Sequence, residues 1–280
     1  MIALGYSGAT QEKGGVREMN ETVTIALIVL VAVLVSLVGL ALVRRFAPTD
    51  QLAQHTEVAG YVYAVIGVIY AVVLALVVIA AWEEYRDARA AVADEASAVL
   101  NLARAANGWP AGDRDAVESA LVAYARQVVD VEWPAMARGD FGPAADIVTV
   151  NHLWQALNEA DASAAAKSAS YEVALLQLND LGEARRNRLL FGQEGLPMSM
   201  AVILIIGAVV TIGFAYLFAV DNGRVHALMI ASLAVLVALL LLLEFQLGRP
   251  FQGVSAIEPT AMELVLAEID ADTGIPGMNS

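Results

Sequence analysis

Residues 58–82 read VAGYVYAVIGVIYAVVLALVVIAAW and contain no charged side chain. At a rise of about 1.5 Å per residue, a helix of this length covers the roughly 30 Å hydrocarbon core of a bilayer. Two acidic residues, Glu83 and Glu84, follow directly. We therefore interpret Val58–Ala81 as a membrane span and Trp82 as its anchor at the membrane surface.

Three other runs have the same character, namely Val23–Val43, Met198–Val220 and Ala227–Leu247. Only Arg44–Glu57 separates the first two spans, and only Asp221–His226 separates the last two. Connections this short make each pair an antiparallel hairpin. The sequence therefore predicts an all-α integral membrane protein with four transmembrane helices in two hairpins and an extramembrane helical domain between spans 2 and 3.

The composition agrees with a membrane location. Hydrophobic residues make up 59% of the 280 residues and charged residues only 16%, whereas a soluble domain has roughly 45–50% apolar and 25% charged residues. The net charge of −14 disfavours binding to nucleic acid, because phosphates repel an acidic chain. With no cysteine, disulfides, thiolate catalysis and cysteine-bound metals are excluded.

We expect five consecutive parts along the chain. They are an N-terminal tail (1–22), hairpin 1 (23–82), the helical domain (83–196), hairpin 2 (197–247) and a C-terminal segment (248–280). Met1–Glu18 is polar and glycine-rich, so we expect a disordered linker there, with either Met1 or Met19 as the true start. A signal peptide is the alternative interpretation of the first span, although Arg44 and Arg45 do not form a small-residue cleavage site.

The helical domain shows helical periodicity throughout. Span 2 is predicted to continue as a stalk to Asn107. Asp113 is the expected N-cap of a second helix that ends before Pro134, and its buried stripe comprises Val117, Leu121, Tyr124, Val128 and Val131. Further helices are expected over Ala144–Leu157, Tyr171–Phe191 and Pro259–Ile269, while Asp161–Ser170 is either a weak helix or a loop.

No motif of an enzyme or cofactor site is present. The histidines His55, His152 and His226 lack metal-ligand spacing, and glycine-rich phosphate loops and nucleophile elbows are missing. We therefore predict that the protein is not an enzyme and has no catalytic residue, metal or cofactor. A catalytic pocket that gathers Glu132, His152 and Arg185 is an alternative that spacing alone does not exclude.

The second span supplies the candidate functional residues. Apolar side chains around an oligomer axis can form a dewetting constriction, and the pore-lining candidates are Ile66, Ile69, Tyr70 and Val73. Glu83, Glu84 and Asp87 are the pore-mouth candidates. The ordinary alternatives are a lipid-facing surface for the apolar candidates and a solvated helix surface for the acidic ones. Glu244 interrupts the fourth span, either as an interfacial carboxylate or as part of a permeation path.

Several segments, which follow one another in the same order, resemble a bacterial membrane-protein family labelled bestrophin-like. They are Ala59–Ala75, Trp82–Tyr85, Asp94–Ala96, Glu132–Met136, Arg185–Leu189 and Arg249–Gly253, with Pro259 behind them. Bestrophins are pentameric chloride channels with four spans and a helical cytosolic domain. The resemblance thus implies a homo-oligomeric ion channel, a pentamer by analogy, whose second span faces the pore.

The chain departs from bestrophins in two respects. Tyr61–Trp82 lacks their aromatic neck pattern, and no acidic calcium clasp is present. Residues 83–196 contain eighteen acidic and ten basic residues, a net charge of −8, which favours cations at a pore mouth. We expect a cation path with a hydrophobic gate near Ile66–Val73. The alternative function is a non-conducting scaffold or sensor whose helical domain binds an unknown protein partner.

Arginine counts predict the orientation. Six arginines flank the side of the large domain and three the side of the short loops, which favours a cytoplasmic domain in a multi-pass protein of the cell inner membrane. The six are Arg86, Arg89, Arg185, Arg186, Arg188 and Arg249, and the three are Arg44, Arg45 and Arg224. Arg44 and Arg45 follow the first span directly and favour the opposite orientation. The expected partners are the lipid bilayer and further copies of the chain, not nucleic acid.

Overall fold

The computed structural model describes residues 6–46, 56–141, 147–160, 169–193, 195 and 197–273. Regular structure in these residues is entirely helical. The helices are α1 (Tyr6–Phe46), α3 (Thr56–Ala106), α4 (Ala111–Arg126), η1 (Gln127–Glu132), α5 (Trp133–Ala137), α6 (Ile147–Glu159), α7 (Ala169–Gln193), α8 (Met198–Ala215), α9 (Gly223–Leu247) and α10 (Thr260–Thr273). They form two compact units, Met1–Trp82 with Leu196–Gly248 (unit 1) and Glu83–Gly195 with Arg249–Ser280 (unit 2).

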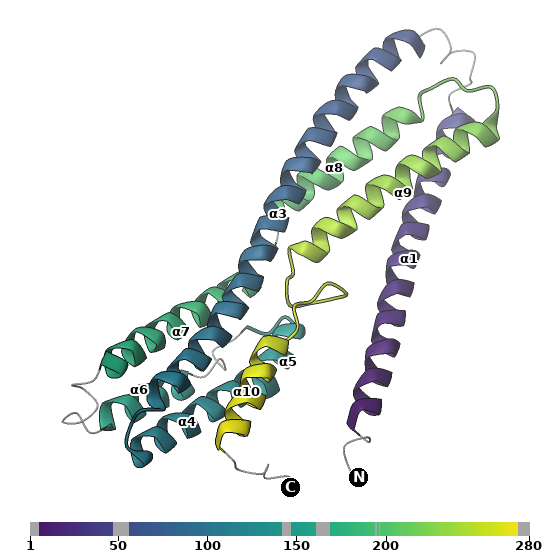
Figure 1. The fold of residues 1–280 in the computed structure, drawn as a ribbon. Coiled ribbons are helices and arrows are strands. Elements are labelled where there is room, and N and C mark those ends of the chain that lie inside the picture. The colour runs from purple at the N-terminus through teal and green to yellow at the C-terminus, as the bar shows by residue number, and fades with distance from the viewer. Residues whose placement is uncertain are drawn as a thin grey trace. The chain divides into compact units, whose positions relative to one another are not determined.

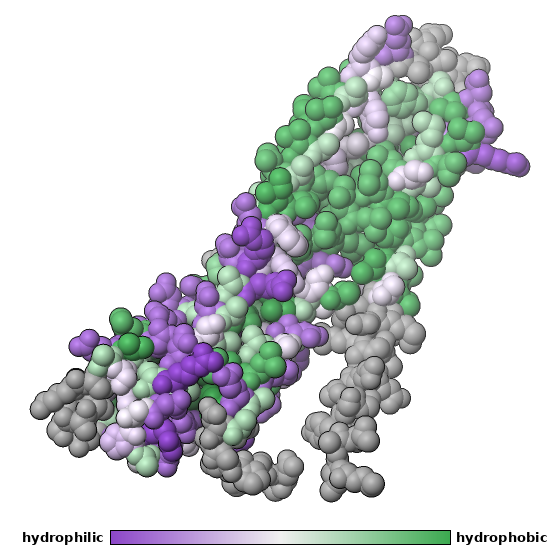
Figure 2. Space-filling model, in the orientation of Figure 1, coloured by the Kyte–Doolittle hydropathy of each residue, from purple (hydrophilic) through white to green (hydrophobic). Residues whose placement is uncertain are grey.

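Unit 1 contains the four predicted spans. α1, the first part of α3, α8 and α9 are long and apolar enough to cross a bilayer (Figure 1). Figure 2 shows their surface as nearly continuous hydrophobic side chains, whereas unit 2 shows mixed polar and apolar side chains. In hydrocarbon each backbone group needs a hydrogen-bond partner within the protein, and helices provide it. The all-α membrane fold is thereby confirmed.

Two small apolar clusters hold the spans of unit 1 together. In the first, α3 contacts α8 and α9; its buried residues are Tyr70, Leu74, Val77, Leu204, Ala208 and Val237. In the second, α1 contacts α8 and α9 through Leu40, Ala215 and Ile230. Both clusters combine bulky side chains with alanines, because a small residue lets neighbouring helices approach closely.

A close contact between α3 and α8 lies at Gly207. A Cβ atom at this position would be 2.5 Å from the ring of Tyr70. The Tyr70 hydroxyl donates a hydrogen bond to the Leu204 carbonyl oxygen, at 3.2 Å. The Tyr70 ring therefore occupies space beside α8 that a side chain at Gly207 would fill. Gly67 of α3, by contrast, has no atom near its would-be Cβ.

Unit 2 is built around a larger core. The second part of α3 contributes one face, and α4, η1, α5, α6, α7 and α10 pack around it. The predicted stalk is thus a helix that ends at Ala106, one residue before the expected Asn107. α4 begins at Ala111 after Pro110, so Asp113 lies in its first turn and is not the N-cap. Proline has the φ angle that a helix start requires and needs no backbone donor.

The register of the α4 stripe changes at η1, which is a π-helical turn. The sequence predicted Val131 on the buried side and a helix end before Pro134. In the structure Val131 is 47% exposed and Glu132 only 4% exposed, and α5 continues the chain to Ala137. A π turn bonds i to i+5 and so accommodates one extra residue. That extra residue moves Glu132 onto the buried face in place of Val131.

Other boundaries differ modestly from expectation. The N-terminal segment expected as linker is helical from Tyr6 onward, in continuation of the first span. α8 ends at Ala215, earlier than the predicted Val220, and α9 begins at Gly223, capped by the Asn222 side chain. The predicted start of α6 and most of Asp161–Ser170 lie outside the described residues.

We expect Gly207→Ala to weaken the contact between α3 and α8. The new methyl group would displace the Tyr70 ring, and overpacking of this kind costs about 1–3 kcal/mol. Gly213→Ala is the matched control in the same helix, because its Cβ would meet open space and alanine favours a helix by about 1 kcal/mol. Denaturant unfolding in detergent measures both, and equal midpoints for the two variants would contradict the contact.

Candidate functional site

The four pore-lining candidates occupy different environments on α3. Ile69 is 60% exposed, whereas Tyr70 is 9% exposed and belongs to the first apolar cluster of unit 1. Ile66 and Val73 are half-buried, and Val73 packs against the same cluster. The structure thus separates the candidates into one exposed residue, two at the edge of the packed face and one within it.

The pore-mouth candidates share an exposed position. Glu83, Glu84 and Asp87 are exposed on α3, as are Arg86 and Arg89 beside them. Among the described residues, no three histidine, aspartate or glutamate side chains are placed together as metal ligands. The three acids therefore share an exposed stretch of α3 with two arginines.

Glu244 lies on α9 and is fully buried. It lines a cavity of about 360 Å³ between α1, α8 and α9 whose other walls are formed mainly by apolar side chains, including Ala32, Ala208 and Ala238. Of the two alternatives that the sequence left open, the interfacial one would have this carboxylate reach out to water. The burial of Glu244 inside unit 1 differs from that expectation.

A buried charge cluster lies in unit 2 and comprises Glu95, Tyr124, Glu132, Arg185 and Arg188. Arg188 is fully buried. Its Nε donates to Glu95 Oε2 at 2.5 Å, and its Nη2 donates to Glu95 Oε1 at 3.0 Å and to Glu132 Oε2 at 2.6 Å. Arg185 Nη2 donates to Glu132 Oε1 at 2.8 Å, and the Tyr124 hydroxyl donates to Glu95 Oε1. Each carboxylate thus accepts bonds through both of its oxygens.

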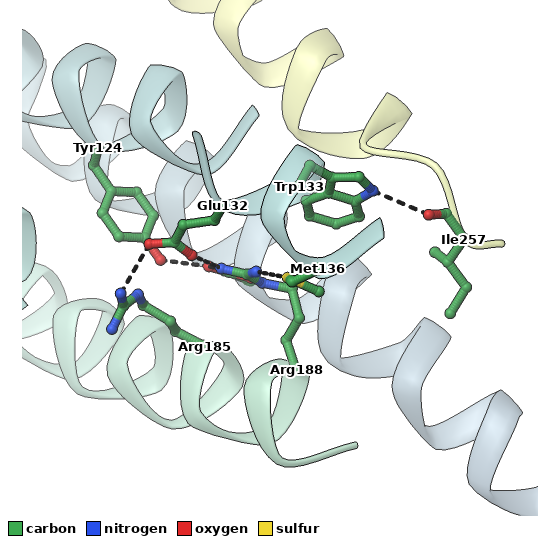
Figure 3. A network of polar contacts seen from close by, with 8 residues as sticks. Tyr124, Glu132, Trp133, Met136, Arg185, Arg188 and Ile257 are labelled. Atoms are coloured by element: carbon green, nitrogen blue, oxygen red, sulfur yellow. Dashed lines mark hydrogen bonds and ion pairs between the residues drawn. The ribbon is translucent and has the colours of Figure 1, made fainter. Parts of the chain in front are cut away.

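A sulfur atom and an aromatic ring lie beside Arg188 in the cluster (Figure 3). The second terminal nitrogen of Arg188 donates to Met136 Sδ at 2.9 Å, and its guanidinium carbon lies 5.3 Å from the centre of the Trp133 ring. Trp133 donates from Nε1 to the Ile257 carbonyl oxygen at 3.0 Å and meets Phe251 edge to face. A cation above an aromatic ring is attracted to its face.

Three segments that adjoin spans in the sequence therefore meet at the charge cluster. Glu95 belongs to the part of α3 that follows span 2, and Arg185 and Arg188 belong to α7, which precedes span 3. Phe251 and Ile257 follow span 4 and reach the cluster through Trp133. The cluster is placed to hold these segments in one fixed arrangement.

Burial and charge shift the pKa values within the cluster. Burial is the first cause that raises the pKa of Tyr124 well above its usual value, and the negative charge of Glu95 adds to it, while Arg188 opposes it. For Arg188, burial lowers the pKa, but the charges of Glu95 and Glu132 outweigh burial and raise it. Tyr124 is therefore neutral and Arg188 is charged throughout the physiological range.

The sequence contains a signal for the cluster in the spacing of its charged residues. Glu95 lies between Val92, Ala96 and Val99 on the buried stripe of α3, and Arg185 and Arg188 continue the spacing of Leu178 and Leu181 on α7. A charge on an apolar stripe indicates a buried partner. Of the residues considered for catalysis, Glu132 and Arg185 are in contact, whereas His152 is exposed on α6.

We expect Arg188→Met to destabilise the protein by about 3–5 kcal/mol, because it leaves two buried carboxylates without their shared cation. Arg186→Met is the matched control, since Arg186 is exposed one position from Arg185 on the same helix and surface substitutions change stability little. Denaturant unfolding of the full chain in detergent measures the difference. Similar midpoints for the two variants would contradict a tightly coupled cluster.

The raised pKa of Tyr124 predicts that the protein loses stability at alkaline pH. Because the pKa of Tyr124 is raised in the folded state, the unfolded chain loses the phenol proton first, near pH 10. Above that pH the free energy of unfolding falls by up to about 1.4 kcal/mol per pH unit, until the folded-state pKa is passed. This contribution is fully present below pH 10. Unfolding titrations at pH 9 to 11 should show a shallower decline for Tyr124→Phe, and an unchanged slope would contradict the assignment.

Comparisons with known proteins agree with the helical architecture. Residues 30–262 match the sequence model of the Bestrophin-like domain. A crystal structure of a bacterial bestrophin homolog from Klebsiella pneumoniae has a TM-score of 0.69 at 17% identity, over 90% of this chain and 100% of that chain. A single-substitution variant of that homolog gives 0.69 at 16% identity, over 89% and 99%.

At 16% and 17% identity, these solved structures show that the chain shares their fold. No curated protein matches the sequence. The domain match, however, covers most of the chain and includes α3, the whole charge cluster, α8 and α9. The protein therefore belongs to the bestrophin-like family.

Proposed function

We propose that this protein forms a homo-oligomeric ion channel in which the exposed face of α3 surrounds the axis. The observation that carries the proposal is a stripe of large apolar side chains on α3 that the single chain leaves uncovered. Val62, Ile69 and Leu76 repeat every seven residues, and Val65 and Val72 lie between them; all five are exposed. Residues seven apart fall on one face of a helix.

The same stripe would form the gate. In a ring of copies, Ile69 and its exposed neighbours would create a short apolar constriction that excludes water unless it widens. The exposure of Ile69 supports its role, and Ile66 and Val73 would flank it. Tyr70 would support the gate from behind, because its ring packs against Gly207 of α8.

Acidic residues follow the apolar stripe. The seven-residue spacing continues from Leu76 to Glu83, and Asp87 comes one helical turn later. At physiological salt the Debye length is about 8 Å, so acids near an ion path act most strongly. Arg86 and Arg89 partly offset them, but residues 83–196 carry a net charge of −8. We infer a path that favours cations.

The membrane orientation belongs to the same proposal. The arginines around the helical domain outnumber those beside the short loops, which supports a multi-pass protein of the cell inner membrane with unit 2 in the cytoplasm. A scaffold that does not conduct is the competing function. Flux separates the two, since a scaffold has no continuous wettable axis.

The decisive measurement is the reversal potential of purified protein in liposomes under a salt gradient. We expect a shift toward the cation equilibrium potential. Replacing Glu83 and Glu84 together by glutamine should reduce the cation preference several-fold, because it removes two negative charges per copy at the mouth. Glu263→Gln on α10, also exposed, is the control and should leave the reversal potential unchanged.

Three outcomes would overturn parts of the proposal. The absence of flux in verified oligomers would favour the scaffold. A reversal potential near that of chloride, unaffected by the double substitution, would show that the acidic cluster does not select the ion. Mass photometry in detergent that finds only monomers would contradict the assembly itself.

A further inference from the structure

His226 lies at the start of α9 and is 2% exposed. Its Nδ1 is 3.1 Å from Nη2 of Arg44, near the end of α1, and its Nε2 is 3.1 Å from the carbonyl oxygen of Ala215, the last residue of α8. The same Nη2 of Arg44 donates to the Val220 carbonyl oxygen at 2.7 Å. One imidazole and one guanidinium thus connect α1, the end of α8 and the start of α9.

These contacts define the protonation state of the imidazole. A guanidinium has only donors, so Nδ1 must accept from Arg44 and carries no proton. A carbonyl oxygen has only acceptors, so Nε2 must carry the proton and donate it to Ala215. The arrangement therefore fits a neutral imidazole in one tautomer. A second proton would place an N–H on Nδ1, opposite a donor of a second cation.

The surrounding chain leaves little room for rearrangement. A Cβ atom at Gly223 would be 2.7 Å from Nη1 of Arg44, and a Cβ atom at Gly39 would be 2.8 Å from the Tyr216 hydroxyl. Glycine at both positions lets the end of α1 pack directly on the α8–α9 connection. A side chain at Gly223 would therefore take the place of the guanidinium beside the connection.

The other charged side chains of these helix ends and of the connection are exposed. Arg45 on α1, Asp221 in the connection and Arg224 on α9 are all exposed. Tyr216 and, on α3, Tyr63 pack against the Leu40 cluster near the same helix end. Within the described residues, Arg44 is the charged group that directly contacts the imidazole.

We propose that Arg44 and His226 form a pH-sensitive latch that holds the end of α1 on the α8–α9 connection and opens when the imidazole is protonated. Opening separates the two cations and exposes the imidazole to water. Histidine is the side chain whose charge normally changes between pH 5 and 8, and such changes drive many pH sensors. The latch responds to the compartment that the α8–α9 connection faces.

Protonation removes the acceptor that Nδ1 offers to Arg44 and places two cations 3.1 Å apart, so the open latch should gain population as the pH falls.

The test uses the absence of cysteine in the chain. Leu40, one turn before Arg44, is 4% exposed and packs on Ala215 and Ile230, whereas Leu42 is 52% exposed. Leu40→Cys and Leu42→Cys are introduced separately into a full chain that carries His55→Gln and His152→Gln, so that His226 is the one histidine. Both are labelled with dithiodipyridine in detergent, and dividing the Leu40→Cys rate by the Leu42→Cys rate removes the intrinsic pH dependence of the thiol.

We expect this rate ratio to rise several-fold from pH 7.5 to 5.0, the range in which histidine side chains normally gain their charge. In His226→Gln the amide can still accept from Arg44 and donate to Ala215 but cannot gain a charge, so the ratio should stay constant. A constant ratio in the histidine-containing chain overturns the latch, and so does an equal rise in His226→Gln. If that variant does not fold, the onset decides, because carboxylates titrate near about 4: an onset below pH 5 overturns the latch.

Discussion

The guanidinium of Arg188 is held at the centre of unit 2 without contact with water. Burying a cation costs several kcal/mol unless its donors are satisfied and its charge is balanced. Glu95 and Glu132 balance it, and Arg185 balances the second carboxylate. The requirement to surround this group explains why helices far apart in the sequence meet here, and why α4 is interrupted by a π turn that brings Glu132 inward.

The charge cluster also determines where the net charge of the domain resides. Its two carboxylates and two guanidinium groups cancel, and Tyr124 is neutral. The net charge of −8 of residues 83–196 is therefore carried by residues outside the cluster, including the exposed Glu83, Glu84 and Asp87. Buried charge in this protein organises helices, whereas surface charge supplies the field that mobile ions meet.

The two units depend on different stabilising interactions. Unit 2 has an extended apolar core around its charge cluster. Among its described residues, unit 1 has two small clusters between its spans and leaves most side chains of Thr22–Phe46 and Glu57–Trp82 exposed. In a bilayer such surfaces contact lipid or other copies of the chain, and association there depends on close packing more than on the hydrophobic effect. The few close contacts, at Gly207 and Gly39, therefore matter more than their area suggests.

The sequence alone determined the four spans, the long stalk and the family, because uncharged runs and helical periodicity are local properties of the chain. Tertiary structure alone decided that Glu132 replaces Val131 on the buried side, that Tyr70 packs inward while Ile69 stays exposed, and that Arg44 meets His226. Each of these depends on a partner far away in the chain or on a single inserted residue in a turn. The periodicity of a sequence shows neither the distant partner nor the inserted residue, because it treats each helix as uniform and isolated.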